Sequence, residues 1–118
     1  MSKVGIIEFD KLEIGDILMR NNTYLREWRC PLPSLTSGSN MFSSCYNLTA
    51  FSSNLSSLTD GSGMFHWCKA LTSFSSDLPS LTQGRSMFNY CTNLKSFTSN
   101  SSGSPVNLSS LTGGFEMF

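Results

Sequence analysis

The chain has 118 residues, which is enough for one ordinary domain with a hydrophobic core of its own. It carries 8 basic and 8 acidic residues, and this balance gives no electrostatic footprint for nucleic acid or for anionic lipid. No apolar run approaches the ~20 residues of a membrane-spanning helix, and the first residues lack the apolar core of a signal peptide. We therefore expect neither membrane insertion nor export by the ordinary secretory route.

Residues 1–24 are predicted to form an N-terminal β-hairpin cap. The segment has short alternating apolar runs, which are typical of two or three strands, and Asn21–Asn22 is suited to the turn of a hairpin. Residues 1–30 also hold ten of the sixteen charged side chains. A charged, atypical unit of this kind is suited to cover the end of a repeat array.

Residues 25–118 contain a repeat whose full copies begin at Leu32, Leu55 and Leu78, a period of 23. Each full copy contains Leu-x-Ser-Leu-Thr followed by Met-Phe-x-x-Cys-x-x-Leu-x-x-Phe, and the three copies align without a gap up to position 100. So short a unit cannot bury these apolar positions alone, whereas stacked copies bury them as ladders. The repeat therefore predicts a right-handed solenoid of about four coils.

Incomplete copies flank the three full ones. A degenerate copy begins at about Leu25, and a fourth copy begins at Leu108 after an insert at residues 101–107, which we expect to form a solvent-exposed bulge. The fourth copy reaches Phe118 without the Cys, the Leu and the strand of the others, which leaves an uncovered apolar end. We expect this end either to be covered by further repeats of a longer protein or to mediate self-association of two chains.

Within each coil, Leu-x-x-Phe-x-Ser predicts one short strand, and the strands of successive coils would form a parallel sheet with ~4.8 Å between neighbours. The Met-Phe-x-x-Cys segment predicts one helical or 3₁₀ turn on the opposite side. One repeat position is always glycine, which suggests a turn with positive φ. The glycines at this position are Gly38, Gly61, Gly84 and Gly114.

The motif Met-Phe-x-x-Cys-x-x-Leu-x-x-Phe, at residues 41–51, 64–74 and 87–97, resembles the BspA-like (Treponema-type) leucine-rich repeats. The core of that family reads Ala-Phe-x-x-Cys-x-x-Leu-x-x-Ile at the same period, and the resemblance covers residues 25–118. Here Met replaces Ala, and Leu-x-Ser-Leu-Thr-x-Gly replaces the second apolar strand of the family. Its members are typically bacterial or protozoan cell-surface proteins, so the resemblance implies a protein- or glycan-binding module for adhesion.

His66 and Cys68 are the residues that most suggest chemistry, as a Cys/His catalytic pair or as half of a metal site. Cysteine recurs at the position of Cys68 in every full copy, which indicates packing, whereas the position of His66 varies freely and indicates surface. Cysteines that recur only once per copy do not provide the close ligand pairs of a zinc site. We therefore expect no enzyme activity, no metal and no cofactor, and cysteines that stay reduced.

Two surfaces are candidates for ligand binding. The first is the outward side of the strand ladder, which is the usual ligand face of curved repeat proteins, and the second is the turn side, where aromatic side chains vary between copies. The candidates on the strand ladder are Arg26, Arg29, Thr49, Ser52, Thr72, Ser75, Lys95 and Thr98. The candidates on the turn side are Tyr46, Trp67 and Tyr90.

Two functions fit a repeat without a unique chemical constellation. The first is a non-catalytic protein- or glycan-binding module of the leucine-rich-repeat type. The alternative is a structural component of a larger assembly, such as a virion or tail-associated protein, which the low charge and the uncovered last coil would suit.

Overall fold

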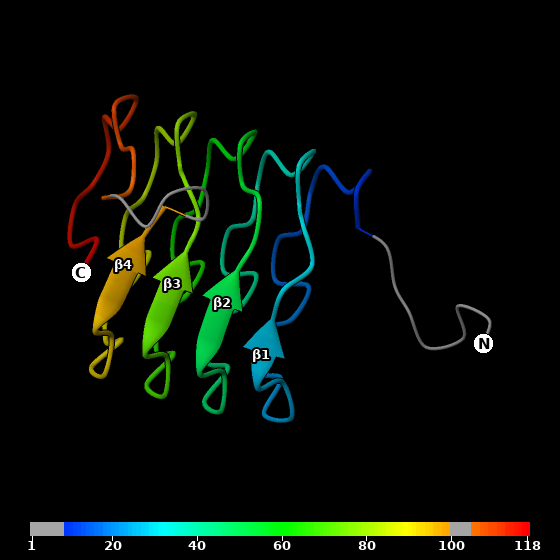
Figure 1. The fold of residues 1–118 in the computed structure, drawn as a ribbon, viewed down its shortest axis with the longest axis vertical. Coiled ribbons are helices and arrows are strands. Elements are labelled where there is room, and N and C mark those ends of the chain that lie inside the picture. Colours follow the sequence, from blue (N-terminus) through cyan, green and yellow to red (C-terminus); the bar gives the residue numbers. More distant parts are fainter. Residues whose placement is uncertain (1–8, 100–104) are drawn as a thin grey trace.

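The computed structural model describes residues 9–99 and 105–118. Its four short strands form one open, parallel sheet in chain order (Figure 1). The strands are β1 (Glu27–Trp28), β2 (Ala50–Ser52), β3 (Ser73–Ser75) and β4 (Ser96–Thr98). Phe51 lies opposite Phe74, and Phe74 lies opposite Phe97, so each strand pairs with the same positions of the next repeat. The predicted parallel sheet with one strand per repeat is thus confirmed.

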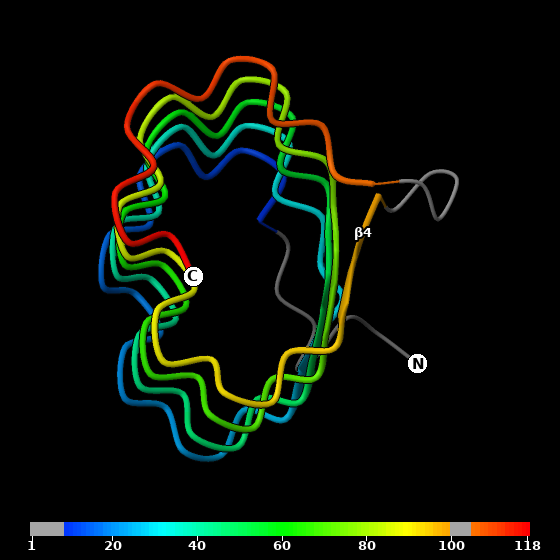
Figure 2. The same ribbon diagram turned by 90° about the vertical axis from the view of Figure 1, so that its left-hand side faces the viewer.

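A second ladder of parallel bridges runs along another side of the stack. It links Ile14 to Ser37, Ser37 to Asp60, Asp60 to Gln83 and Gln83 to Gly113. The link from Gln83 to Gly113 bridges a longer stretch of sequence than the other links, and the difference equals the length of the insert at residues 101–107. The insert therefore does not change the register of the ladder. Figure 2 shows the successive turns of the chain lying on one another, with the strands together on one side.

The helical or 3₁₀ turn expected in the Met-Phe-x-x-Cys segment is absent from the described residues, and this expectation was wrong. The segment consists of successive turns in which alternate amides bond different partners. The amide of Asn40 donates to the Ser62 carbonyl of the next repeat at 3.0 Å, whereas that of Met41 donates to the Gly38 carbonyl at 2.9 Å. A helix would need every amide for bonds within its own segment. Asn40 and Ser44, with φ of 56° and 61°, also leave the helical region.

The glycines shared by the repeats do not have the positive φ that we expected, since among the described glycines only Gly63 has one, at 63°. They provide room instead. A Cβ on Gly38 would lie 3.2 Å from Sδ and Cε of Met64, and a Cβ on Gly61 would lie 3.0 Å from Sδ of Met87. The recurring glycine therefore permits the methionine of the next copy to pack closely against the backbone.

The core consists of ladders of identical side chains. Phe42 stacks on Phe65 with ring centroids 5.5 Å apart, and Phe51 stacks on Phe74 at the same distance. The two ladders meet edge to face, with Phe51 and Phe65 at 4.7 Å, which is a preferred aromatic geometry. The leucines and methionines of the repeats lie around them with no exposed surface. These residues are Leu32, Leu35, Met41, Leu48, Leu58, Met64, Leu71, Leu78, Leu81 and Met87.

The hairpin expected at Asn21–Asn22 is not present, since residues 9–24 contain no strand; residues 1–8 lie outside the described residues. This segment lies instead on the first full repeat. The amide of Gly15 donates to the Ser37 carbonyl at 2.8 Å, and that of Asn21 to the Ser43 carbonyl at 2.9 Å. These are the bonds that later copies also make, so the segment continues the parallel stack and does not pair with itself as an antiparallel hairpin.

Most of the insert, residues 101–104, also lies outside the described residues, so its exposure stays a prediction. Its last part returns along the sheet. Pro105 forms an antiparallel bridge with Thr98 of β4, and the amide of Asn107 lies 3.4 Å from Oδ1 of Asp77. The third and fourth copies are thus joined beside the last strand.

Candidate functional site

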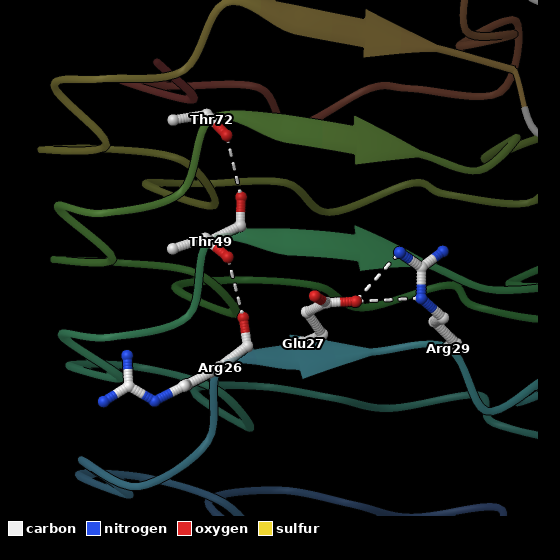
Figure 3. A network of polar contacts seen from close by, with 5 residues as sticks. All are labelled: Arg26, Glu27, Arg29, Thr49 and Thr72. Atoms are coloured by element: carbon white, nitrogen blue, oxygen red, sulfur yellow. Dashed lines mark hydrogen bonds and ion pairs between the residues drawn. The ribbon is translucent and has the colours of Figure 1, made fainter.

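One row of side chains crosses the outward side of the sheet because its members share one position of the repeat. The row consists of Arg26, Thr49, Thr72 and Lys95, all of them exposed. The Thr49 hydroxyl donates to the Arg26 carbonyl and the Thr72 hydroxyl to the Thr49 carbonyl, both at 3.0 Å (Figure 3). These bonds fix the threonine rotamers and use their hydroxyl protons within the protein. The row therefore presents two cations at its ends, three strand spacings or about 14 Å apart.

A second row on this side contains Arg29, Ser52, Ser75 and Thr98. Both Nη2 and Nε of Arg29 bond Oε1 of Glu27, at 2.8 and 3.0 Å (Figure 3). Both side chains are more than half exposed, so this ion pair adds little stability. Its main effect is to neutralise Arg29, while Ser52, Ser75 and Thr98 are half-buried. Among residues 9–99 and 105–118, the cations of the sheet face without an ion-pair partner are consequently Arg26 and Lys95.

An aromatic cluster lies on the turn side and consists of His66, Trp67 and Tyr90. Trp67 and Tyr90 stack with centroids 4.2 Å apart and planes 9° from parallel. The His66 ring lies 5.7 Å from each of them. Lys69 completes the cluster, with Nζ 5.0 Å from the Trp67 centroid, a cation–π contact of about 0.5–1 kcal/mol at an exposed site. Trp67 and Tyr90 were predicted from the sequence as turn-side candidates, whereas Lys69 was missed. Whether the Lys69 ammonium reaches the Trp67 ring depends on the direction of its side chain, which the sequence does not give.

The two stacked rings stand on unusual backbone. Trp67 has φ of 66° and Tyr90 has φ of 65°, values that bulky L-residues rarely adopt. Asn21 and Ser44, at the same repeat position, share this conformation with φ of 63° and 61°. Such strain persists only where surrounding contacts hold it, and it concentrates at functional sites. The bond from the Trp67 amide to the Asn89 carbonyl at 3.0 Å holds this conformation at Trp67, whereas the Tyr90 amide donates to no backbone acceptor within the described residues. At Tyr90 the stack on Trp67 accompanies the left-handed backbone.

Tyr46, the remaining candidate, is not part of this cluster. It shares its repeat position with Lys69 rather than with Trp67. Its side chain is 47% exposed and forms no ring contact within the described part of the chain. The structure therefore brings two of the three predicted aromatic residues together and leaves the third as a separate exposed ring.

An open groove of about 500 Å³ lies over the last full repeat, at the apolar end that the incomplete fourth copy leaves uncovered. Tyr90 of the aromatic cluster forms part of its wall, as does Lys95 of the sheet row. The floor is apolar. The lining residues are Phe88, Tyr90, Cys91, Thr92, Leu94, Lys95, Phe97 and Phe118. An aromatic face, a cation and an apolar floor in one groove are typical of a recognition site.

His66 and Cys68 do not form a catalytic pair. The Cys68 thiol is buried and donates to the Phe42 carbonyl at 3.1 Å, while the His66 ring packs on Trp67 and Tyr90. Burial raises the pKa of the Cys68 thiol far above its ordinary value and lowers the pKa of His66. A neutral thiol on a backbone carbonyl is a packing residue and not a prepared nucleophile.

Cys45 and Cys91 repeat this arrangement, donating to the Met19 and Phe65 carbonyls at 3.1 and 3.0 Å. Cys45, Cys68 and Cys91 are thiols that form no disulfide. Within residues 9–99 and 105–118, no three His, Cys, Asp or Glu side chains converge as metal ligands. The same residues include no helix of the length and hydrophobicity needed to cross a membrane.

Comparison with known proteins gave no matching family model, no similar curated protein and no similar solved structure.

Proposed function

We propose that the chain is a leucine-rich-repeat-type, right-handed solenoid that acts as a non-catalytic protein- or glycan-binding module. The repeat motif and the constant register between successive strands support the fold. The observation that carries the function is the groove between Tyr90 and Lys95, whose wall includes a residue of each candidate surface. By its resemblance to the BspA-like repeats, the module would serve in adhesion at a cell surface.

The geometry of the groove suits recognition rather than chemistry. Tyr90 is 49% exposed and stacked on Trp67, so a rigid ring is held ready for a sugar or an apolar side chain. Lys95 has no ion-pair partner among the described residues and is available to an anionic group. The thiol of Cys91, also in the wall, has its pKa raised by burial to about 12 and stays protonated.

The test is binding of the purified chain to a panel of glycans and a panel of cell-surface proteins. We expect Tyr90→Ala and Lys95→Ala each to weaken binding of any ligand found, by about tenfold or more for an aromatic anchor. Tyr24→Ala and Lys11→Ala are matched controls, since both residues are exposed and lie outside the groove. A ligand whose affinity is the same for all four variants would contradict the proposed site.

The alternative, a structural component of a larger assembly, has support of its own. Large apolar side chains are exposed at both ends of the stack. They are Ile14, Ile17 and Leu18 at one end and Phe115 and Phe118 at the other, each between 49% and 63% exposed. A building block needs such self-complementary ends, whereas a monomeric binding module does not.

A further inference from the structure

The two ends of the stack carry complementary backbone groups. On the turn side, each copy donates from alternate amides to carbonyls of the next copy. The last of these bonds run from Gly84 to Gly113, from Ser86 to Phe115 and from Phe88 to Met117, at 2.7, 3.0 and 2.6 Å. The amides that would continue the pattern are those of Gly114, Glu116 and Phe118. Within the described residues these three amides donate to no backbone acceptor.

The opposite end has the matching acceptors. The carbonyls of Ile14, Asp16 and Leu18 occupy the repeat positions of the acceptors at Ser37, Ser39 and Met41. Among the described residues they accept no backbone amide. Donors at one end and acceptors at the other therefore share the same spacing and the same repeat positions. An exposed backbone ladder of this kind is a template for another chain.

The side chains at the two ends match in the same register. Leu18 holds the repeat position of Met41 and Met64, and Gly114 holds that of Gly38. Met64 packs 3.2 Å from the point where a Gly38 Cβ would lie, so Leu18 of another copy has an equivalent place over Gly114. Leu18 has nearly the same volume as methionine and is 49% exposed in the single chain.

Phe115 and Asp16 also hold one repeat position, so they would lie one above the other. Phe115 is 62% exposed and packs on the Arg85 guanidinium at 5.2 Å. Its other side would face residue 16 of a second copy, whose Asp16 carboxylate accepts from the Ser37 hydroxyl and the Ser39 amide of its own chain at 2.6 and 3.0 Å. A charge placed at residue 115 would thus lie about one strand spacing, ~5 Å, from residue 16 and would act on the Asp16 charge.

We propose that a second copy of the chain docks head to tail, with residues 14–18 of one copy on residues 114–118 of the other. Three amide–carbonyl bonds, from Gly114 to Ile14, Glu116 to Asp16 and Phe118 to Leu18, continue the ladder across the contact. The contact joins different surfaces of the two copies, so it does not close on itself and extends into a filament. Phe118 belongs both to this contact and to the lining of the groove, so association is tested on the chain without any ligand.

The test is sedimentation velocity of the 118-residue chain over a concentration series. We expect association that rises with concentration. Leu18→Asp and Phe115→Glu should each weaken it by about tenfold or more, because an apolar contact is lost or a like charge faces Asp16. Phe115→Lys, which also removes the ring from Arg85, should retain association because its cation faces Asp16. Tyr46→Asp is the control for an added charge on an exposed aromatic residue, since Tyr46 is 47% exposed and lies in the second turn of the stack, away from both ends.

A mixture of two blocked variants separates this contact from any symmetric one. Leu18→Asp leaves the donor end at residues 114–118 intact, and Phe115→Glu leaves the acceptor end at residues 14–18 intact. Each variant alone should therefore stay monomeric, while an equal mixture forms a one-to-one dimer. Circular dichroism and thermal melting verify that both variants are folded. A chain that stays monomeric at all concentrations would overturn the proposal. So would continued association of both single variants, or a mixture that forms no dimer.

Discussion

Met64 lies against the backbone of Gly38, with Sδ and Cε 3.2 Å from the place where a Cβ on that glycine would stand. The same relationship recurs between Gly61 and Met87, where the distance to Sδ is 3.0 Å. Both distances are shorter than ordinary van der Waals contact. The methionine of each copy therefore requires the glycine of the copy before it.

Gly61→Ala is expected to lower the free energy of unfolding by about 1–3 kcal/mol, since an added methyl overpacks a core with no free space. Ser62→Ala, one residue away and half-buried, should change it by less than ~0.5 kcal/mol. Urea denaturation measures both. Adding Met87→Ala should relieve the clash, so the double variant should lose less stability than the sum of the single variants. Additive losses would show that the glycine acts through its backbone and not through Met87.

Cys68→Ser should lower the free energy of unfolding by roughly 1–3 kcal/mol. The thiol is fully buried and bonds the Phe42 carbonyl, and a hydroxyl in this apolar place is costly to dehydrate. His66→Ala should change stability by less than ~0.5 kcal/mol, because its ring is only partly buried at the edge of the aromatic cluster. Differential scanning calorimetry distinguishes the two. Equal and large losses would contradict the packing role of Cys68.

The repeat period and the position of the strands could be predicted from the sequence, because the spacing of the apolar residues shows which positions of each copy must be buried. Phe51, Phe74 and Phe97 were thus placed in one ladder. The role of Gly38 could not be predicted, because its partner belongs to the next copy and recurrence alone does not distinguish a turn from a close approach. The first turn of the stack was missed because Leu18, Met19 and Asn22 replace the Met, Phe and Cys of the motif, which hides the repeat.

The candidate site was predictable to a similar degree. Trp67 and Tyr90 share one repeat position, so their proximity follows from the period of the repeat. The separation of Tyr46 follows from the same period, since it shares a position with Lys69. The groove beside Tyr90 and Lys95 lies at the apolar end that the incomplete fourth copy was expected to leave uncovered. Its walls could not be predicted, because they depend on how the side chains of the last copies are oriented.

Stability should fall at alkaline pH because of the buried thiols. Burial raises the pKa of Cys91 from 9.0 to about 12, so the unfolded chain releases its proton first. The stabilisation is complete below pH 9 and is lost as the pH rises from about 9 to 12, at up to ~1.4 kcal/mol per pH unit for one thiol. Cys91→Ala should therefore show a shallower decline of unfolding free energy than the parent chain over this range. Parallel curves for the two proteins would mean that Cys91 titrates normally when folded.

The left-handed backbone at Tyr90 predicts an unusual order of stability among its variants. Tyr90→Ala and Tyr90→Gly both remove the ring from the stack on Trp67, so they lose the same contact. At φ of 65° a Cβ is strained and a glycine is not, so the glycine variant should be the more stable of the two by about 1 kcal/mol. Asn89→Ala and Asn89→Gly are the controls, because Asn89 has no positive φ. At this position the alanine variant should be the more stable of the two, because glycine gains more conformational freedom on unfolding. Thermal denaturation of the four variants decides the matter. If alanine is favoured at both positions, the backbone at Tyr90 is not held in the left-handed region, and the stacked rings would then stand on relaxed backbone.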